Sequence, residues 1–315
     1  MLKRKLGKNG PELTVIGFGA WAIGGPWKWG WGKVDDNESI EAIRTALDNE
    51  INWIDTAAVY GLGHSEEVVA EAIKDRRKEV FVATKCGMVP DGKGGANINN
   101  HPNSIRKEIE DSLRRLQTDY VDLYQIHWPD PNVPVEDSWG EMVKIKQEGK
   151  ARFIGVCNFD VNLLERCMKI EHVQSLQPPF SMLRRDVAKE ILPYCEKNGI
   201  GVVAYSPMQA GLLTGNFHTK KLAEDDWRKN NPYFQEPYLS KALELVERLR
   251  PIAAKADKTV GNLAVAWVLS HSAITSAIVG ARNKNQVLEN IKAAEYVLTK
   301  EDLSEIEKLL KEFEL

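Results

Sequence analysis

The sequence has few of the features that mark secreted or metal-binding proteins. Its four cysteines, Cys86, Cys157, Cys167 and Cys195, include no CxxC pair, so neither a zinc knuckle nor a redox pair is indicated. None of the six histidines belongs to an HxH or HxxxH pair, and a histidine-rich metal site is therefore not expected. This cysteine usage favours a protein whose thiols stay reduced in the cytosol.

Long apolar runs and an excess of one charge are also missing. No stretch approaches the ~18 uninterrupted apolar residues of a membrane span, and no apolar run follows the charged N-terminus as it would in a signal peptide. The 42 basic residues nearly balance the 45 acidic ones, and no segment gathers them into a basic stripe. We therefore expect a cytoplasmic protein with neither nucleic acid nor membrane as its partner.

What the sequence does contain is a regular alternation of short apolar runs and amphipathic stretches. In 37–47, for example, Ile40, Ile43 and Leu47 fall on one helical face. Strict alternation of strand and helix requires a parallel sheet, and eight such units in roughly 300 residues favour a closed (β/α)₈ barrel over an open sheet. The predicted strands are Val15–Trp21, Trp53–Thr56, Val80–Lys85, Val121–His127, Arg152–Val156, Val173–Gln177, Gly201–Ala204 and Ser276–Val279.

Additional elements are predicted at both ends of the chain. Leu2–Gly7 and Glu12–Val15 flank an Asn-Gly turn and predict a hairpin that closes the bottom of the barrel. Extra helices include the last one, Asp302–Glu312. Because no linker of proline, glycine and serine divides the chain, we expect residues 1–315 to form a single α/β barrel domain.

Four polar residues stand at or just beyond the C-terminal ends of three neighbouring predicted strands. Asp55 belongs to the second strand, Lys85 ends the third, and His127 ends the fourth. Tyr60 lies five residues past Asp55, in the loop that leaves the second strand. In a (β/α)₈ barrel the C-terminal strand ends converge on one face, so these side chains are expected to meet there.

The four side chains together suit the reduction of a carbonyl by a hydride. The developing alkoxide needs a proton, and a tyrosine with its ordinary pKa of about 10 delivers one poorly near neutrality. A lysine ammonium would lower that pKa, a carboxylate would hold the lysine in place, and a neutral imidazole would bind the carbonyl oxygen. Each residue alone has an ordinary structural explanation, so the hypothesis rests on the set.

Six collinear blocks of the chain carry a resemblance to a known family: Asn52–Gly61, Ala83–Lys85, Asp119–Trp128, Ile154–Phe159, Ala204–Gly215 and Ile278–Asn290. Together these blocks resemble the aldo-keto reductase superfamily. Within it, the chain resembles the bacterial general stress proteins that are also similar to potassium channel β-subunits. The resemblance implies that Tyr60 is the proton donor, assisted by Lys85 and Asp55, and that His127 orients the substrate.

The resemblance also implies a nicotinamide cofactor held across the strand ends without a Rossmann domain. Asn158 and Gln177 match the residues that hold the carboxamide, and Tyr205 matches the aromatic stacked on the nicotinamide ring. Where the family often has serine before the asparagine, this chain has Cys157, and we expect little consequence. The full predicted cofactor set is Ala20, Trp21, Asp55, Asn158, Gln177, Tyr205, Ser206, Pro207, Met208, Gln209, Gly211, Leu212, Gly215, Gly280, Arg282, Gln286, Glu289 and Asn290.

Two segments of that set are expected to bind phosphate. The small residues of 206–215 allow backbone N–H groups to approach a pyrophosphate, and a roughly 25-residue irregular segment follows them. The last block opens a helix after the final strand, where barrels commonly bind phosphate. The resemblance places Arg282 at the adenosine 2′-phosphate, which a planar guanidinium suits, so NADPH is expected rather than NADH.

Tryptophans are concentrated near the expected substrate. Trp27, Trp29 and Trp31 crowd one loop and Trp128 follows His127, which predicts an apolar wall suited to aryl aldehydes or α-keto compounds. An oligomer contact is the alternative use of such aromatics. The predicted substrate-binding residues are Trp21, Trp27, Tyr60, His127 and Trp128.

The sequence also contains features of two other functions. Residues 17–22 partly match a Rossmann fingerprint, but that motif needs a helix at once, and Gly24-Gly25-Pro26 with the tryptophan-rich loop opposes one. A binding module remains open, because channel β-subunits share the scaffold and the tetrad. The sequence also leaves open the substrate and the choice between a monomer and a homo-oligomer.

Overall fold

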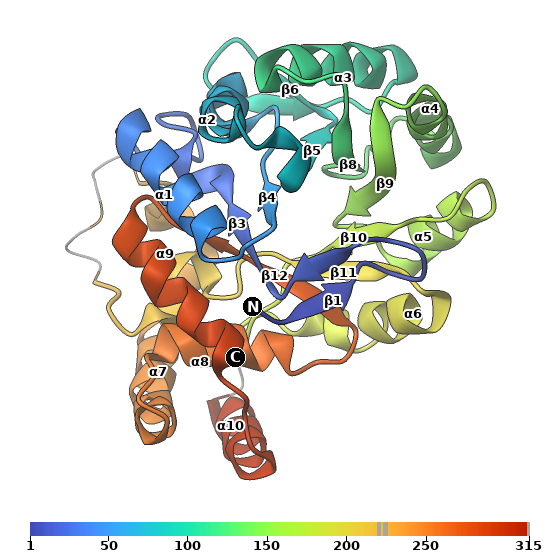
Figure 1. Ribbon diagram of the computed structural model, residues 1–315. Helices are drawn as coiled ribbons and strands as arrows, with labels where there is room; N and C mark the ends of the chain where they lie inside the picture. The colour runs from blue at the N-terminus through green and yellow to red at the C-terminus, as the bar shows by residue number, and fades with distance from the viewer. Residues whose placement is uncertain (219–221, 223–225, 314–315) are drawn as a thin grey trace.

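The computed structural model describes residues 1–218, 222 and 226–313. At its centre is a closed barrel of eight parallel strands in the order β10-β11-β12-β3-β4-β5-β8-β9. Figure 1 labels these strands in the middle of the molecule. The predicted (β/α)₈ barrel is confirmed. Its strands are β3 (Ile16–Gly19), β4 (Trp53–Asp55), β5 (Phe81–Cys86), β8 (Val121–Ile126), β9 (Ala151–Cys157), β10 (Ser175–Gln177), β11 (Gly201–Ala204) and β12 (Ile274–Gly280).

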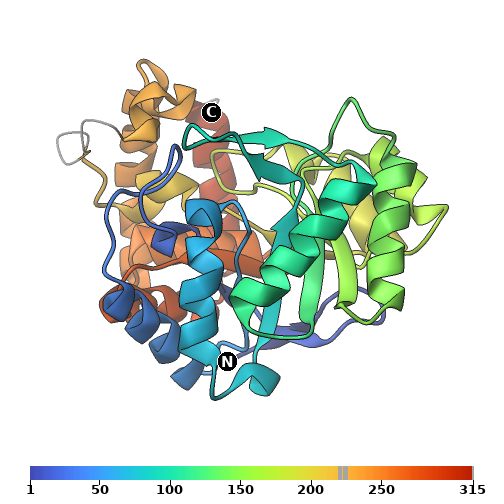
Figure 2. The ribbon, with the colours of Figure 1, turned by 90° about the horizontal axis from the view of Figure 1, so that it is seen from above.

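Helices form the outer layer of the barrel (Figure 1, Figure 2). In α1 the Asp35 side chain caps the first turn, and Ala42, Ile43 and Ala46 are buried. Of the predicted apolar face, Ile43 is buried, whereas Ile40 and Leu47 are only partly buried against the core. Among the described residues, no helix combines the length and the apolar character needed to cross a membrane. The helices are α1 (Asp36–Asp48), α2 (His64–Ile73), α3 (Pro102–Leu116), α4 (Val135–Gln147), α5 (Val161–Met168), α6 (Ile191–Asn198), α7 (Tyr238–Lys255), α8 (Val260–Leu269), α9 (Lys284–Asn290) and α10 (Lys300–Phe313).

Apolar side chains fill the barrel interior separately from the layer between strands and helices. Alternate residues of a strand point inward, and these inner residues form a cluster of their own. Gly17 belongs to the same interior, where a methyl group would overlap the Trp53 indole. The interior cluster consists of Leu6, Leu13, Trp53, Phe81, Ala83, Leu123, Val203 and Ile278.

An N-terminal hairpin closes one end of the barrel. β1 (Lys3–Lys5) pairs antiparallel with β2 (Glu12–Thr14), as the Asn-Gly turn predicted. Leu6 and Leu13 are completely buried in the interior cluster, and Gln174 Nε2 donates a 2.5 Å hydrogen bond to the Leu6 carbonyl. The hairpin therefore plugs the N-terminal ends of the strands, and the opposite rim remains for polar chemistry.

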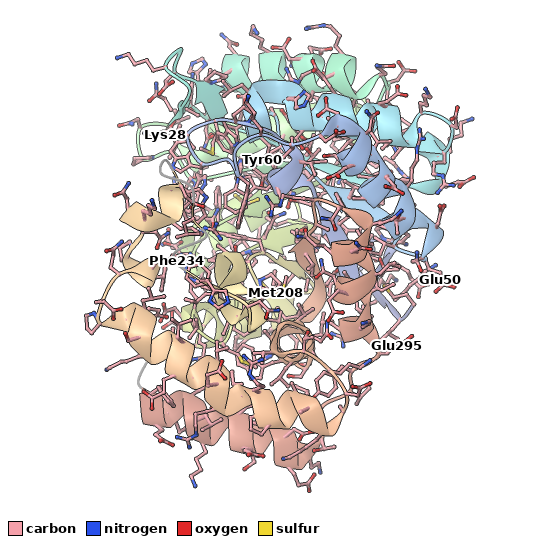
Figure 3. The ribbon with its side chains drawn as sticks, turned by 90° about the vertical axis from the view of Figure 1, so that its left-hand side faces the viewer. Lys28, Glu50, Tyr60, Met208, Phe234 and Glu295 are labelled. Atoms are coloured by element: carbon pink, nitrogen blue, oxygen red, sulfur yellow. The ribbon has the colours of Figure 1, made fainter. Side chains whose placement is uncertain are left out.

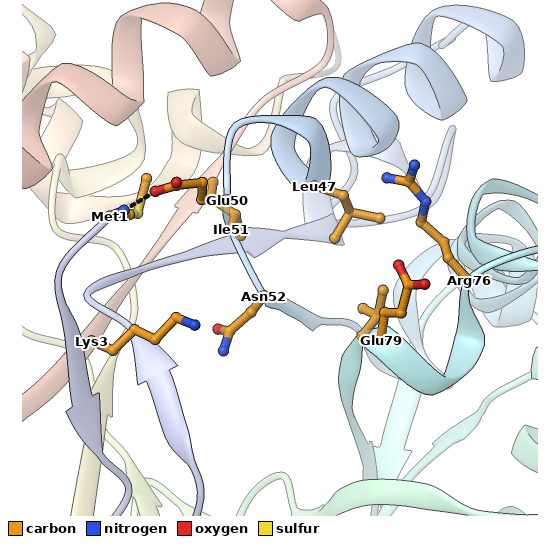
Figure 4. A pocket seen from close by; sticks show the side chains of 9 residues that line it. Met1, Lys3, Leu47, Glu50, Ile51, Asn52, Arg76 and Glu79 are labelled. Atoms are coloured by element: carbon orange, nitrogen blue, oxygen red, sulfur yellow. Dashed lines mark hydrogen bonds and ion pairs between the residues drawn. The ribbon is translucent and has the colours of Figure 1, made fainter.

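A surface hollow of about 350 Å³ lies at this plugged end (Figure 4). It is lined by Met1, Lys3, Asn52 and Val80, among others. Asn52 and Val80 directly precede β4 and β5, whereas Asp55 and Lys85 lie at the C-terminal ends of those strands. The hollow is therefore on the other side of the barrel from the predicted tetrad.

A second hairpin was not predicted. β6 (Met88–Pro90) and β7 (Ala96–Ile98) pair antiparallel after β5. The Asp91 carboxylate accepts hydrogen bonds from the backbone N–H groups of Lys93, at 2.7 Å, and Gly95, at 2.9 Å, and so closes the turn. The signal was the glycine-rich run after Asp91, which is typical of a tight turn.

Several predicted boundaries were wrong by a few residues. The first strand ends at Gly19 rather than Trp21, because Ala20–Ile23 forms a 3-10 helix that buries Ala20 and Ile23 three residues apart. The α-helix between β10 and β11 begins only at Ile191, and the helix after β12 changes from α to 3-10 geometry after Asn290.

The segment between β11 and α7 contains short 3-10 helices where an irregular stretch was predicted. They are Gln209–Thr214, Trp227–Asn230 and Pro232–Phe234. Residues 219–221 and 223–225 of the predicted irregular segment lie outside the described residues.

Candidate active site

The structure brings the four predicted catalytic side chains together at the open rim. Lys85 Nζ donates to Asp55 Oδ2 at 2.6 Å and to the Thr56 carbonyl at 2.9 Å, and it lies 3.2 Å from Tyr60 Oη. The Tyr60 and His127 rings meet edge to face with centroids 5.8 Å apart. Lys85 therefore has an acceptor for each of its three N–H donors, although its side chain is fully buried.

Figure 3 shows Lys28 and Phe234 on one side of the view and Glu50, from the plugged end, on the other.

Buried hydroxyls and a buried carboxylate hold the tetrad strands from outside the barrel. Thr56 Oγ1 lies 2.9 Å from Ser65 Oγ, which donates to the Ala20 carbonyl at 2.9 Å. Glu66 accepts from Thr84 Oγ1 at 2.5 Å and from Arg115 Nε at 2.7 Å. The ends of β4 and β5 are thus fixed to the start of α2, a support that sequence reasoning did not identify.

Burial and charge set the protonation states of the tetrad. Burial lowers the pKa of Lys85, but the Asp55 carboxylate and Tyr60 outweigh it, so the pKa is raised and the ammonium persists. Burial raises the pKa of Tyr60, while Lys85 opposes the rise. Burial, with Lys85, also holds the pKa of His127 well below its ordinary range. The sequence predicted that Lys85 lowers the pKa of Tyr60, and its contribution does have that sign. Burial outweighs this contribution, so at neutral pH Tyr60 is a phenol beside the neutral imidazole of His127.

The three residues predicted to hold the nicotinamide are linked to the tetrad. Gln177 Nε2 donates to Asp55 Oδ1 at 2.8 Å, and Asn158 Nδ2 donates to the His127 carbonyl at 2.9 Å. Tyr205 Oη donates to Asn158 Oδ1 at 2.9 Å. These contacts place Asn158, Gln177 and Tyr205 beside Asp55 and His127, although their sequence blocks are far apart.

The segment predicted to approach a pyrophosphate has an unusual backbone. Positive φ angles occur at Ser206 (56°), Gln209 (46°), Ala210 (49°), Gly211 (96°) and Gly215 (81°). Three of these residues have side chains, and the left-handed region costs such a residue about 1–3 kcal/mol unless its surroundings enforce it. Pro207, Gln209 and Leu212 are buried and anchor the segment, and the backbone N–H groups of Gln209 and Gly211 donate within it to the Ser206 and Met208 carbonyls.

The residues predicted around the adenosine gather at the start of α9. The Arg282 backbone N–H donates to Gln286 Oε1 at 2.8 Å, and Asn290 Nδ2 donates to the Gly280 carbonyl at 3.1 Å. Glu289 is held by Lys292 at 2.7 Å and by Thr259 at 3.0 Å. Arg282 is exposed and forms no ion pair with the part of the chain that the structure describes.

Tryptophans from two distant loops meet over this rim, and sequence reasoning missed part of the arrangement. Trp21 contacts Trp31 and Trp227, with ring centroids 5.7 and 5.5 Å apart. The Arg228 guanidinium lies 4.2 Å from the Trp31 ring, and that of Arg282 lies 5.9 Å from it. Trp31, Trp227 and Arg228 therefore belong to the site. The concentration of tryptophans in the loop after β3 was the sequence feature that pointed to this region. No sequence pattern shows which loops contact each other.

The indole N–H groups of Trp31 and Trp227 fit a phosphate-bearing cofactor. Both nitrogens are buried without a hydrogen-bond partner among the described residues. An unsatisfied buried donor costs about 1–3 kcal/mol, which an acceptor oxygen of a ligand would recover. Together with the Arg282 guanidinium, which forms no ion pair with the described residues, these donors suit a dinucleotide.

The predicted substrate-binding residues are only partly assembled. The Trp27 ring lies 6.2 Å from the Tyr60 ring and 5.3 Å from that of Trp29. Trp128 is 36% exposed beside His127, and its ring contacts none of the other described aromatics. The structure thus places Trp27 and His127 beside Tyr60, packs Trp21 on Trp31 and Trp227, and leaves Trp128 at the surface.

Comparison with known proteins agrees with this geometry. The model of the Aldo/keto reductase family matches residues 15–311. The chain belongs to the aldo/keto reductase family. The resemblance of its six sequence blocks is thereby confirmed.

Two relatives of this aldo/keto reductase are bacterial proteins that it matches over most of their length. It is 39% identical to aldo-keto reductase YhdN of Bacillus subtilis, over 96% of this chain and 91% of the relative. It is 36% identical to the NADH-specific methylglyoxal reductase of Escherichia coli, over 96% of both chains. Among solved structures, the glycerol dehydrogenase AKR11B4 from Gluconobacter oxydans is similar with a TM-score of 0.89 and 38% identity, over 99% of this chain and 95% of that one.

The buried Lys85–Asp55 pair can be tested through stability and turnover. Lys85→Met should lower the free energy of unfolding by about 3–5 kcal/mol, because it leaves a buried carboxylate without its cation. Carbonyl reduction should fall at least about 100-fold. Urea unfolding and initial rates measure the two effects.

Lys107→Met is the matched control, since it removes an exposed lysine that pairs with Asp111 at 2.6 Å. That surface pair should contribute less than about 0.5 kcal/mol. Equal stability losses in the two variants would contradict the role given to the buried pair.

Proposed function

We propose that this aldo/keto reductase converts aldehydes and ketones to alcohols with NADPH, and that Tyr60 donates the proton. The observation that supports this proposal most strongly is the position of Lys85 Nζ, 2.6 Å from Asp55 Oδ2 and 3.2 Å from Tyr60 Oη. A lysine on the surface is solvated by water, whereas a fully buried lysine is rare unless it is paired with other groups. The three groups form a proton-donating unit rather than a simple ion pair.

Each member of the tetrad has a distinct task in this proposal. A bound nicotinamide would supply the hydride. Tyr60 gives its proton to the developing alkoxide, and the Lys85 ammonium stabilises the phenolate that remains. Asp55 keeps Lys85 charged and in place. His127, neutral at physiological pH because burial lowers its pKa, donates a hydrogen bond to the carbonyl oxygen.

The aromatic surroundings of Tyr60 support a substrate that is apolar beyond its carbonyl. Trp27 lies beside the Tyr60 ring, and we assign Trp21, Trp27, Tyr60, His127 and Trp128 to substrate binding. Aryl aldehydes and α-keto compounds are the proposed substrate classes. The name of the Escherichia coli relative, a methylglyoxal reductase, is in keeping with an α-keto aldehyde.

The proposed preference for NADPH rests on Arg282. Its guanidinium is exposed at the start of α9 and carries no ion pair among the described residues, so it is available to a 2′-phosphate. The Escherichia coli relative is named as NADH-specific, so family membership alone does not imply this preference. We further propose that residues 1–315 act as a single cytoplasmic domain, as a monomer or a homo-oligomer.

An assay of carbonyl reduction tests the function. Purified protein with NADPH and a panel of aryl aldehydes, α-keto compounds and aldoses should consume NADPH fastest with the first two classes. Tyr60→Phe should slow turnover at least about 100-fold while leaving NADPH affinity nearly unchanged, because it removes only the proton donor. Since burial raises the pKa of Tyr60, the wild-type rate should not fall as the pH rises from neutrality toward about 10.

Three outcomes would contradict the proposal. Binding of NADPH without turnover of any carbonyl would favour a binding module. Equal rates for wild type and Tyr60→Phe would remove Tyr60 from the chemistry. Turnover of aldoses alone would refute the apolar substrate classes.

The cofactor preference is tested separately with Arg282→Ala. The variant should raise KM for NADPH by about 10-fold or more and change KM for NADH little, because a charge-assisted contact to one phosphate is lost. Arg248→Ala is the matched control, since Arg248 pairs with Glu312 on the surface between α7 and α10. Parallel changes of both KM values in Arg282→Ala would exclude a 2′-phosphate contact.

A further inference from the structure

Tyr60 stands at the start of a short turn with a left-handed backbone. Gly61, Leu62 and Gly63 follow it with φ angles of 59°, 57° and 112°. The left-handed region is sterically unfavourable for Leu62. Its side chain is 41% exposed, so burial of that side chain does not offset the strain. Some other contact must therefore hold the turn in this conformation.

That contact is with the backbone of Gly24. A methyl group on Gly61 would overlap the Gly24 carbonyl, and a methyl group on Gly24 would lie 2.9 Å from Gly61 N, 2.9 Å from Tyr60 C and 3.3 Å from Tyr60 O. Gly24 has φ −68° and ψ −9°, a conformation open to any residue. The close approach of the two backbones, and not the dihedral angles, therefore restricts position 24 to glycine.

Gly24 also begins the loop of residues 24–32 that carries the tryptophans. Within this loop the Trp27 ring lies 6.2 Å from the Tyr60 ring. The backbone N–H of Lys28 donates to the Gly94 carbonyl at 3.1 Å, which anchors the loop to the β6–β7 hairpin. The loop thus touches Tyr60 twice, at its backbone through Gly24 and at its ring through Trp27.

From these contacts we infer that Gly24 is a positioning residue for Tyr60. Loop 24–32 as a whole holds the proton donor in place, so that the loop and Tyr60 act as one unit. The inference rests on the proposed function, in which Tyr60 donates the proton. A side chain at position 24 would displace the backbone at Tyr60 and Gly61 by a few tenths of an ångström. Displacements on the order of 1 Å cost about 100-fold in rate when they alter a reacting group.

Gly24→Ala tests the inference. We expect kcat to fall by about 10-fold, with the Kd for NADPH from tryptophan fluorescence and the thermal midpoint near wild type. In a Tyr60→Phe background the same exchange should change the residual rate little, because the group that Gly24 positions is already gone. Gly32→Ala is the control: it lies in the same loop and nothing lies within 4 Å of an added methyl group, so its φ of 76° gives backbone strain in the loop without the contact to Tyr60.

The possible outcomes separate this inference from the proposed function. No turnover by the wild-type protein would refute the function itself. An active wild type with an equally active Gly24→Ala would refute only the positioning role. An equal loss from Gly24→Ala with and without the Tyr60 hydroxyl, or an equal loss in Gly32→Ala, would show a general effect on the loop and also overturn the inference.

Trp27→Leu examines the same unit from the ring side if Gly24→Ala does not fold. For an aldehyde too small to reach the tryptophans, such as formaldehyde, the variant should lower kcat, because the loop no longer supports the Tyr60 ring. A change in KM alone would mean that Trp27 only contacts the substrate. The inference that loop 24–32 holds Tyr60 in place would then be rejected.

Discussion

The contact between Lys85 and Asp55 is the interaction on which the rest of the rim depends. Both groups are buried at the ends of neighbouring strands, where removal from water costs several kcal/mol per ion unless every donor and acceptor is satisfied. The structure meets that requirement with Thr56, Tyr60 and Gln177. The same contacts that make the buried pair tolerable also place a phenol beside an ammonium, so the requirements of stability and of proton transfer coincide.

Loops from distant parts of the chain complete the site above this pair. The loop after β3 supplies Trp27 and Trp31, the segment after β11 supplies Trp227 and Arg228, and the start of α9 supplies Arg282. Arg228 and Arg282 pack on the Trp31 ring, Trp227 packs on Trp21, and Trp27 packs beside Tyr60. Because the plugged N-terminal end has its own apolar cluster, changes in these loops alter recognition without changing the barrel core.

Sequence reasoning was strongest where a regular period exists. Alternation of strand and helix predicted the barrel, and the positions of Asp55, Lys85 and His127 at strand ends followed from it. The left-handed turn after Tyr60, the β6–β7 hairpin and the packing of Trp31 on Arg228 were not predictable in the same way. Each depends on contacts between segments that the local pattern does not specify, such as the approach of Gly24 to Gly61.

A crystal structure of the protein with its nicotinamide cofactor and an unreactive carbonyl analogue would test the central claim most directly. The account predicts that the carbonyl oxygen lies within about 2.6–3.2 Å of both Tyr60 Oη and a ring nitrogen of His127, with Lys85 still bridging Asp55 and Tyr60. A carbonyl oxygen bound elsewhere on the rim, with Tyr60 beyond hydrogen-bonding distance, would contradict it.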